Sequence, residues 1–348
     1  MRTVLTASLI AFAAPAAADV PNVVTDIAPV HSLVASVMEG VGEPYLLIEP
    51  GVSPHHYALK PSEARKISNA DVVFWIGEED TPWLGETVET LAPDAMSVEM
   101  LDLEGSILLP VREGGNFAPH DHGGEGHDHV DGHDEHDHVD GHDDHDHADG
   151  HGDHDHADGH DDHAQAAGHD DHDHAAHGTD PHAWLDPRNA QTWLRAIAEI
   201  LAEADPENAV AYRANAERTA EELGTLDVTI AVRLKDTPRG FITFHDAYQY
   251  FENRFDIRAR GALSASDAVE PGPARVAALR EMVQREGVSC LFAEPQFNPR
   301  QVATLAEDLN LRTGTLDPIG AQLEPGPALY GRLVTGIADA LMVCLNGE

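Results

Sequence analysis

The sequence is poor in cysteine, lacks long hydrophobic runs and has one long stretch without a basic residue. Only two cysteines occur among its 348 residues, which argues against a zinc site of clustered thiolates, because such sites use close pairs of cysteines. The apolar run near the N-terminus is too short to span a bilayer, and no other run is long and apolar enough. We therefore expect no direct insertion into a membrane.

Acidic residues strongly outnumber basic ones. The chain has 62 Asp and Glu against 21 Lys and Arg, which gives a formal net charge of −41 with histidine neutral. Residues 120–180 contribute 21 of these acids and no base, so the remaining chain still carries −20. This balance argues against binding to nucleic acid or anionic lipid and suits the binding of cations.

One segment consists of little more than histidine and aspartate. It holds 19 of the 24 histidines, between His120 and His177, and Lys and Arg are absent from Glu113 through Pro187. A nine-residue unit begins at residues 131, 140 and 149, but each unit has one glycine and only Val or Ala, which disfavours a calcium-binding β-helix. With almost no Leu, Ile or Phe, residues 113–179 are predicted to be a disordered, metal-sequestering loop in the first lobe.

The N-terminus has the pattern of a secretory signal. Arg2 precedes an apolar segment at residues 4–14, and small residues at 16–18 precede Asp19, so residues 1–18 are predicted to be a signal peptide. Export places Cys290 and Cys344 in an oxidising compartment, where an even pair is most simply a disulfide and less readily a metal-ligand pair.

Outside the His/Asp-rich segment, short apolar runs alternate with amphipathic stretches. This alternation predicts an α/β fold of two lobes, each with a mainly parallel sheet flanked by helices, joined by one long linking helix. The predicted N-terminal lobe is residues 19–205, the linking helix 206–235 and the C-terminal lobe 236–348. Ser62, Asp186 and Asp205 are expected as helix N-caps. Strands are predicted at residues 23–27, 45–48, 72–77, 97–101, 241–244, 257–263, 290–293 and 312–316.

Five histidines lie outside the His/Asp-rich segment: His31, His55, His56, His182 and His245. Several of them, and Asp317, follow predicted strands, at the edge where parallel sheets bind ligands. Taken singly, each histidine is more readily a structural residue. In a chain with a His-rich segment, several of them together indicate a metal site, although neither HExxH nor paired CxxC occurs, so the ligands must converge in the fold.

Five motifs resemble, in order, those of the ZnuA-type zinc-binding receptors of ABC importers. They are PGVSPHHY at residues 50–57 with KPSE at 60–63, DPHAWLDP at 180–187, FHDAYQYF at 244–251, EPQF at 294–297 and LDPIG at 316–320. The resemblance covers essentially the whole mature chain, and a His-rich loop before the second motif is typical of the zinc-binding members.

The resemblance implies His55, His182 and His245 as the three imidazole ligands, with Asp317 or water as the fourth. His56 is implied to be a neighbour of the site. Some members have a glutamate immediately before the first ligand, where this chain has Pro54. The resemblance also implies a Cys290–Cys344 disulfide within the second lobe.

Metal identity follows from the ligand types. Manganese receptors of the same fold have a carboxylate at the third position, where this chain has His245. Three neutral nitrogens favour Zn²⁺ over manganese, whereas copper or nickel compete on intrinsic affinity.

The resemblance implies a monomeric periplasmic receptor, not an enzyme. It would capture Zn²⁺ between the lobes and deliver it to the membrane permease of an ABC importer, with the long helix limiting hinge motion. The alternatives are a His-rich periplasmic metal buffer or chaperone, a zinc hydrolase using three histidines and an open position, or a manganese receptor.

Overall fold

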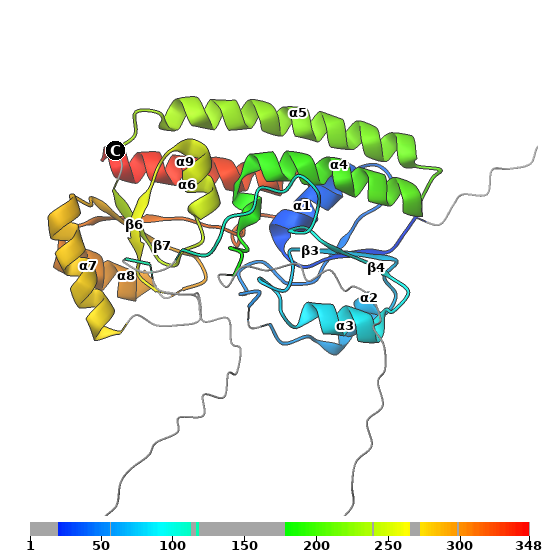
Figure 1. Ribbon diagram of the computed structural model, residues 1–348, viewed down its shortest axis with the longest axis horizontal. Coiled ribbons are helices and arrows are strands. Elements are labelled where there is room, and N and C mark those ends of the chain that lie inside the picture. Colours follow the sequence, from blue (N-terminus) through cyan, green and yellow to red (C-terminus); the bar gives the residue numbers. More distant parts are fainter. Residues whose placement is uncertain are drawn as a thin grey trace, which may run out of the picture. The chain divides into compact units, whose positions relative to one another are not determined.

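The computed structural model describes residues 20–55, 57–112, 116–117, 178–238, 240–264, 272–297 and 299–347 (Figure 1). The predicted signal peptide, His56 and nearly all of the predicted disordered loop at residues 113–179 lie outside these ranges. The described ranges contain His31, His55, His182 and His245, together with Asp317 and both cysteines.

The first lobe contains a four-stranded parallel sheet in the order β2-β1-β3-β4. Its central strands β1 and β3 are fully buried runs of Val, Thr, Phe and Trp, as expected for parallel strands covered on both faces. Its strands and helices are β1 (Val23–Thr25), α1 (Ala28–Val37), β2 (Tyr45–Leu46), α2 (Pro61–Ile67), β3 (Val72–Trp75), α3 (Leu84–Leu91) and β4 (Met96–Glu99).

The second lobe repeats this topology. Its four parallel strands lie in the order β6-β5-β7-β8, so the predicted fold of two helix-flanked parallel sheets is confirmed. Its strands and helices are β5 (Phe241–Thr243), α6 (Gln249–Phe255), β6 (Ala259–Ala262), α7 (Pro273–Glu286), β7 (Cys290–Ala293), α8 (Pro299–Leu309), β8 (Arg312–Thr315) and α9 (Leu329–Asn346).

A 3₁₀ turn and two helices connect the lobes: η1 (Ala183–Leu185), α4 (Pro187–Ala204) and α5 (Ala209–Leu234). Helix α5 lies along α4 and contacts α1 in the first lobe and α6 and α9 in the second (Figure 1). It is the long linking helix expected from the sequence.

Of the three predicted caps, one is confirmed. The Asp186 side chain accepts a hydrogen bond from the Arg188 amide at the start of α4. The cap predicted at Ser62 is wrong, because α2 begins at Pro61 and Lys60 is the residue before it. Asp205 is also wrong as a cap, because α5 begins three residues beyond Pro206, at Ala209, and Asn208 is the residue before it.

The hydrophobic core is continuous between the lobes. One buried cluster contains Val73 and Phe74 of β3, Tyr212 of α5, and Phe292 of β7. The predicted disulfide is present and joins Cys290 at the start of β7 to Cys344 in α9. The second lobe is therefore tied both to its own last helix and to the core of the first.

Helix α9 corrects one sequence-based expectation. Its 18 residues have a mean hydropathy of 1.2, so among the described residues it is long and apolar enough to cross a membrane. Half of that stretch is buried, and Leu333, Ile337 and Leu341 pack in the core. A core helix passes the same length and hydropathy test, so α9 is no evidence for membrane insertion.

Candidate metal centre

The three predicted ligand histidines come from three distant parts of the chain and meet at the ends of the two sheets. His55 lies in the loop between β2 and α2, His182 immediately precedes η1, and His245 follows β5. His55 and His245 thus lie past the carboxyl ends of parallel strands, where open α/β sheets bind ligands. His182 and His245 are only 4% and 3% exposed.

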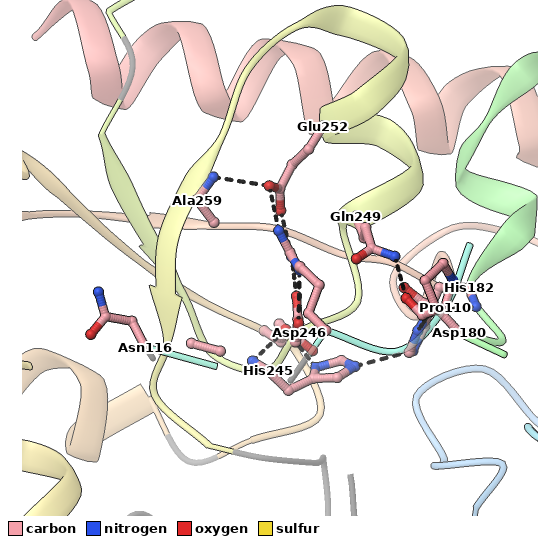
Figure 2. A network of polar contacts seen from close by, with 12 residues as sticks. Pro110, Asn116, Asp180, His182, His245, Asp246, Gln249, Glu252 and Ala259 are labelled. Carbon is pink, nitrogen blue, oxygen red and sulfur yellow. Dashed lines mark hydrogen bonds and ion pairs between the residues drawn. The ribbon is translucent and has the colours of Figure 1, made fainter. Parts of the chain in front are cut away.

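The imidazoles of His182 and His245 face each other (Figure 2). Their Nε2 atoms are 3.4 Å apart and their ring centroids 5.3 Å apart. Two nitrogens bound to one tetrahedral zinc at about 2.0–2.1 Å lie about 3.3–3.4 Å apart. The separation of the two Nε2 atoms therefore matches two ligands of a single zinc ion.

A buried carboxylate orients each of these two rings. Nδ1 of His182 donates to Asp180 Oδ1 at 2.8 Å, and Nδ1 of His245 donates to Glu294 Oε1 at 2.8 Å. A carboxylate only accepts hydrogen bonds, so the proton of each neutral ring is on Nδ1 and its Nε2 is an acceptor. Two acceptors facing each other suit a cation between them, and a carboxylate behind a ligand histidine is the usual support of a zinc site.

His55 completes the set from the first lobe. Its ring centroid is 6.3 Å from that of His182. Its loop is held by Trp83, whose indole Nε1 donates to the Pro54 carbonyl at 3.2 Å, and Tyr57 packs on the same indole with ring centroids 5.7 Å apart. In the described part of the chain, no three His, Cys, Asp or Glu side chains are already close enough to hold a metal ion. His55 thus lies near the other two imidazoles, without the three rings forming a closed ligand set.

The three imidazoles line one small cavity of about 10 Å³. A cavity of that size is large enough for a single ion or water molecule. Trp184 forms part of its wall, with its indole ring centroid 5.2 Å from that of His182 and its Nε1 donating to the Pro318 carbonyl at 2.7 Å. Its lining residues are Pro54, His55, Asp80, His182, Trp184, His245, Gln296, Pro318 and Ile319.

Asp317, the predicted fourth ligand, is not among the residues that line this cavity. Its Oδ1 accepts the amides of Gly320 and Ala321 at 2.9 Å, and its Oδ2 accepts the amide of Gln322 at 3.3 Å. The carboxylate thus shapes the turn after β8. The acid that does line the cavity is Asp80, whose Oδ1 is 3.9 Å from His55 Nε2.

The two ends of the His/Asp-rich segment meet beside the site. Pro110 pairs with Thr179 as an antiparallel bridge. The Tyr250 hydroxyl accepts the Leu109 amide at 2.9 Å and donates to the Asp180 carbonyl at 2.8 Å. The two chain segments that flank the His/Asp-rich segment are therefore joined to Asp180, the residue that orients His182.

Arg112 attaches the incoming strand to the second lobe. Its guanidinium makes ion pairs with Asp246, the neighbour of His245, and with Glu252 of α6. Both acids are 3% exposed. Burial raises the pKa of each carboxyl, and the hydrogen bonds and charge of Arg112 oppose that rise. Farther along, the Asn116 carbonyl accepts the Ala262 amide at 3.2 Å, next to the edge strand β6.

Known proteins share this architecture. A family model described as the periplasmic zinc-uptake complex component A, ZnuA, matches residues 23–344. The chain belongs to the ZnuA family. It is 44% identical to the high-affinity zinc uptake system protein ZnuA of Paracoccus denitrificans over 347 residues, which cover 99% of this chain and 98% of that protein. It is 43% identical to the Brucella suis protein of the same name over 326 residues, which cover 93% of this chain and 92% of that protein.

The solved structures that this member of the ZnuA family resembles include the periplasmic zinc-binding protein TroA from Treponema pallidum. The TM-score is 0.69 at 19% identity, over 93% of this chain and 99% of that one. At this identity the likeness concerns the fold alone.

In this ZnuA family member, sequence reasoning did not assign roles to three acids near the histidines. Asp180 and Glu294 lie within motifs at residues 180–187 and 294–297, and Asp80 follows β3. Their positions just before a ligand histidine or just after a parallel strand are the signals by which they could have been found.

Proposed function

We propose that this chain is the zinc receptor of an ABC importer in the periplasm. It captures Zn²⁺ between its two lobes with the imidazoles of His55, His182 and His245 and delivers the ion to a membrane permease. The observation that carries this proposal is the pair of Nε2 atoms of His182 and His245, 3.4 Å apart and each backed by a carboxylate on Nδ1.

The donor set supports zinc over manganese. Three neutral nitrogens match the preference of zinc for imidazole, whereas manganese prefers oxygen ligands. The ZnuA relatives named above are zinc uptake proteins by name. A cavity of about 10 Å³ also suits a receptor for a single ion.

The His/Asp-rich segment is proposed to collect zinc near the site. Its ends are fixed beside His182 and His245 through Tyr250 and Arg112, so metal bound to the segment is delivered close to the cavity. We expect deletion of residues 120–178 to slow zinc transfer without abolishing tight binding.

Zinc titration of three proteins tests the proposal: the mature chain, the chain without residues 120–178, and the His245→Ala variant. We expect one tight site that survives the deletion and weakens by at least about 100-fold in His245→Ala, because a ligand is lost. The matched control is His31→Gln, which changes a histidine that contacts the Pro44 carbonyl and does not line the cavity. If no tight site remains after the deletion, the chain is a metal buffer and the receptor proposal fails.

A further inference from the structure

We propose that Asp80 is the fourth ligand of the zinc site and that Asp317 is not. This inference rests on the proposed zinc-receptor function and deepens it by naming the residue that completes the coordination shell. Pro54, which directly precedes His55, has no carboxylate, so an acidic ligand has to come from another part of the site.

The position of Asp80 in the fold is that of a ligand. It follows β3, which is hydrogen-bonded to β1 at the centre of the first sheet, and its amide donates to the Gly77 carbonyl at 3.2 Å in the turn after that strand. His55 follows β2 in the same sheet. Both side chains therefore leave the carboxyl-terminal edge of one parallel sheet, and both line the cavity that also contains His182 and His245.

The distances place the Asp80 carboxylate on the metal side of His55. Its Oδ1 is 3.9 Å from Nε2 of the His55 ring. His182 and His245 also face each other through their Nε2 atoms. A nitrogen and an oxygen bound to one tetrahedral zinc lie about 3.3 Å apart. The observed separation exceeds the one expected for two ligands of one zinc ion by only about 0.6 Å.

Electrostatics favours an acid at this point. Three neutral imidazoles leave the full double positive charge of zinc in a buried cavity, and one carboxylate halves it. Asp80 is fully buried, whereas Glu78, two residues earlier in the same turn, is exposed. The carboxylate of Asp317 is held by three backbone amides of its own turn instead, so moving it to the ion would break those hydrogen bonds.

Zinc affinity measured by chelator competition on the full mature chain gives the first test. We expect Asp80→Asn to weaken the tight site by about 10- to 100-fold, while Asp317→Asn and the exposed control Glu78→Gln change it less than about threefold. Loss of affinity in Asp317→Asn without loss in Asp80→Asn would overturn the inference, as would unchanged affinity in both, which would leave water as the fourth ligand.

Cobalt spectroscopy separates a ligand from a residue that only orients His55. With one equivalent of Co²⁺, Asp80→Cys should gain an intense near-ultraviolet thiolate-to-cobalt charge-transfer band, and Asp317→Cys should not. This readout requires only a folded site and does not depend on Asp80→Asn remaining stable. Absence of the band in Asp80→Cys, with Co²⁺ still bound by the histidines, contradicts the assignment.

The His245→Ala variant distinguishes this inference from the proposed function. If tight zinc binding survives His245→Ala, the receptor site itself is wrong. If His245→Ala abolishes tight binding while the Asp80 variants bind zinc and show no change in spectrum, only the assignment of Asp80 fails.

Discussion

Buried carboxylates stand behind two of the three imidazoles of the proposed metal centre. Glu294 fixes the proton of His245 on Nδ1, and Asp180 does the same for His182. A histidine oriented in this way presents Nε2 at a fixed angle and with raised basicity. Two residues that never touch the ion thereby set part of its affinity.

The first prediction concerns Glu294. Replacing it with Gln removes the negative charge behind His245 while keeping the shape of the side chain, so zinc affinity should fall by about tenfold. Chelator competition measures this, with Glu217→Gln as the control, because Glu217 pairs with Arg195 at an exposed position. Equal affinities of Glu294→Gln and the control would show that Glu294 does not tune the site.

The second prediction concerns Asp26, a fully buried acid that follows β1. Burial raises the pKa of its carboxyl from 3.8 to about 7, although the amides of Ile76 and Ile27 donate hydrogen bonds to it and oppose the rise. The folded state therefore holds a proton that the unfolded state has already released. The contribution of Asp26 to stability accordingly falls as pH rises from about 4 to about 7 and is constant above that.

Urea unfolding at pH 5 and pH 8 measures this effect. Relative to Asp26→Asn, the unaltered chain should lose about 2–3 kcal/mol of unfolding free energy between these pH values. The variant serves as the reference because it removes this one titration and leaves the other acids in place. A difference between the two proteins that is the same at both pH values would contradict the assigned pKa.

At the scale of elements, the extended segment at residues 107–112, which leads into the His/Asp-rich segment, ties the lobes together at the site. It passes from β4 of the first lobe to α6 and β6 of the second, where Gln249 Nε2 donates to the Pro110 carbonyl at 2.9 Å. Arg112 is its main anchor, because its guanidinium lies between two buried carboxylates.

The third prediction is that Arg112→Ala destabilises the fold by about 3–5 kcal/mol, since it leaves Asp246 and Glu252 buried without their common cation. Urea unfolding measures it. The control is Arg213→Ala, whose partner Glu199 is exposed, and which should lower the stability far less. Similar losses in the two variants would mean that Arg112 acts as a surface residue.

An element can be predicted from the sequence when the interactions that define it join residues close together along the chain. All eight strands of the two described sheets were expected from local apolar runs. The cap at Ser62 was misplaced because Pro61 itself opens α2, and the cap at Asp205 because residues 206–208 form a turn before α5 begins at Ala209. The contacts of Arg112 join residues 134 and 140 positions apart, and no local pattern reveals such a pairing.

The same distinction holds for the candidate site. The three histidines were identified from motifs, and the structure brings them to one cavity. Asp80 belongs to none of those motifs, and its proximity to His55 arises only when β2 and β3 are placed in one sheet. The predicted ligand role of Asp317 stays a prediction and competes with the proposal for Asp80.

On the scale of the whole molecule, the two lobes share one core and two long helices. Helix α5 contacts elements of both lobes, and α9 of the second lobe packs on α1 of the first, where the Ser32 hydroxyl donates to the Pro327 carbonyl at 3.1 Å. Opening the lobes widely would expose this shared core. Capture and release of the ion should therefore depend on movement of loops, above all the His55 loop.

The fourth prediction is that zinc leaves the relation of the lobes almost unchanged. Small-angle scattering of the chain without residues 120–178 should give the same radius of gyration with and without zinc, because the continuous core resists hinge motion. The variant His245→Ala, treated in the same way, controls for effects of zinc away from the site. A clear contraction on zinc binding, absent from the variant, would show that the lobes close as rigid bodies.

The central claim is that one zinc ion is held by three imidazoles between the lobes. Zinc-edge X-ray absorption on the chain without residues 120–178, loaded with one equivalent of zinc, tests it most directly. The account predicts a four-coordinate centre with three imidazole nitrogens at about 2.0–2.1 Å and one oxygen at about 2.0–2.2 Å. A shell made of oxygen alone, or a shell with fewer than three imidazoles, would contradict it.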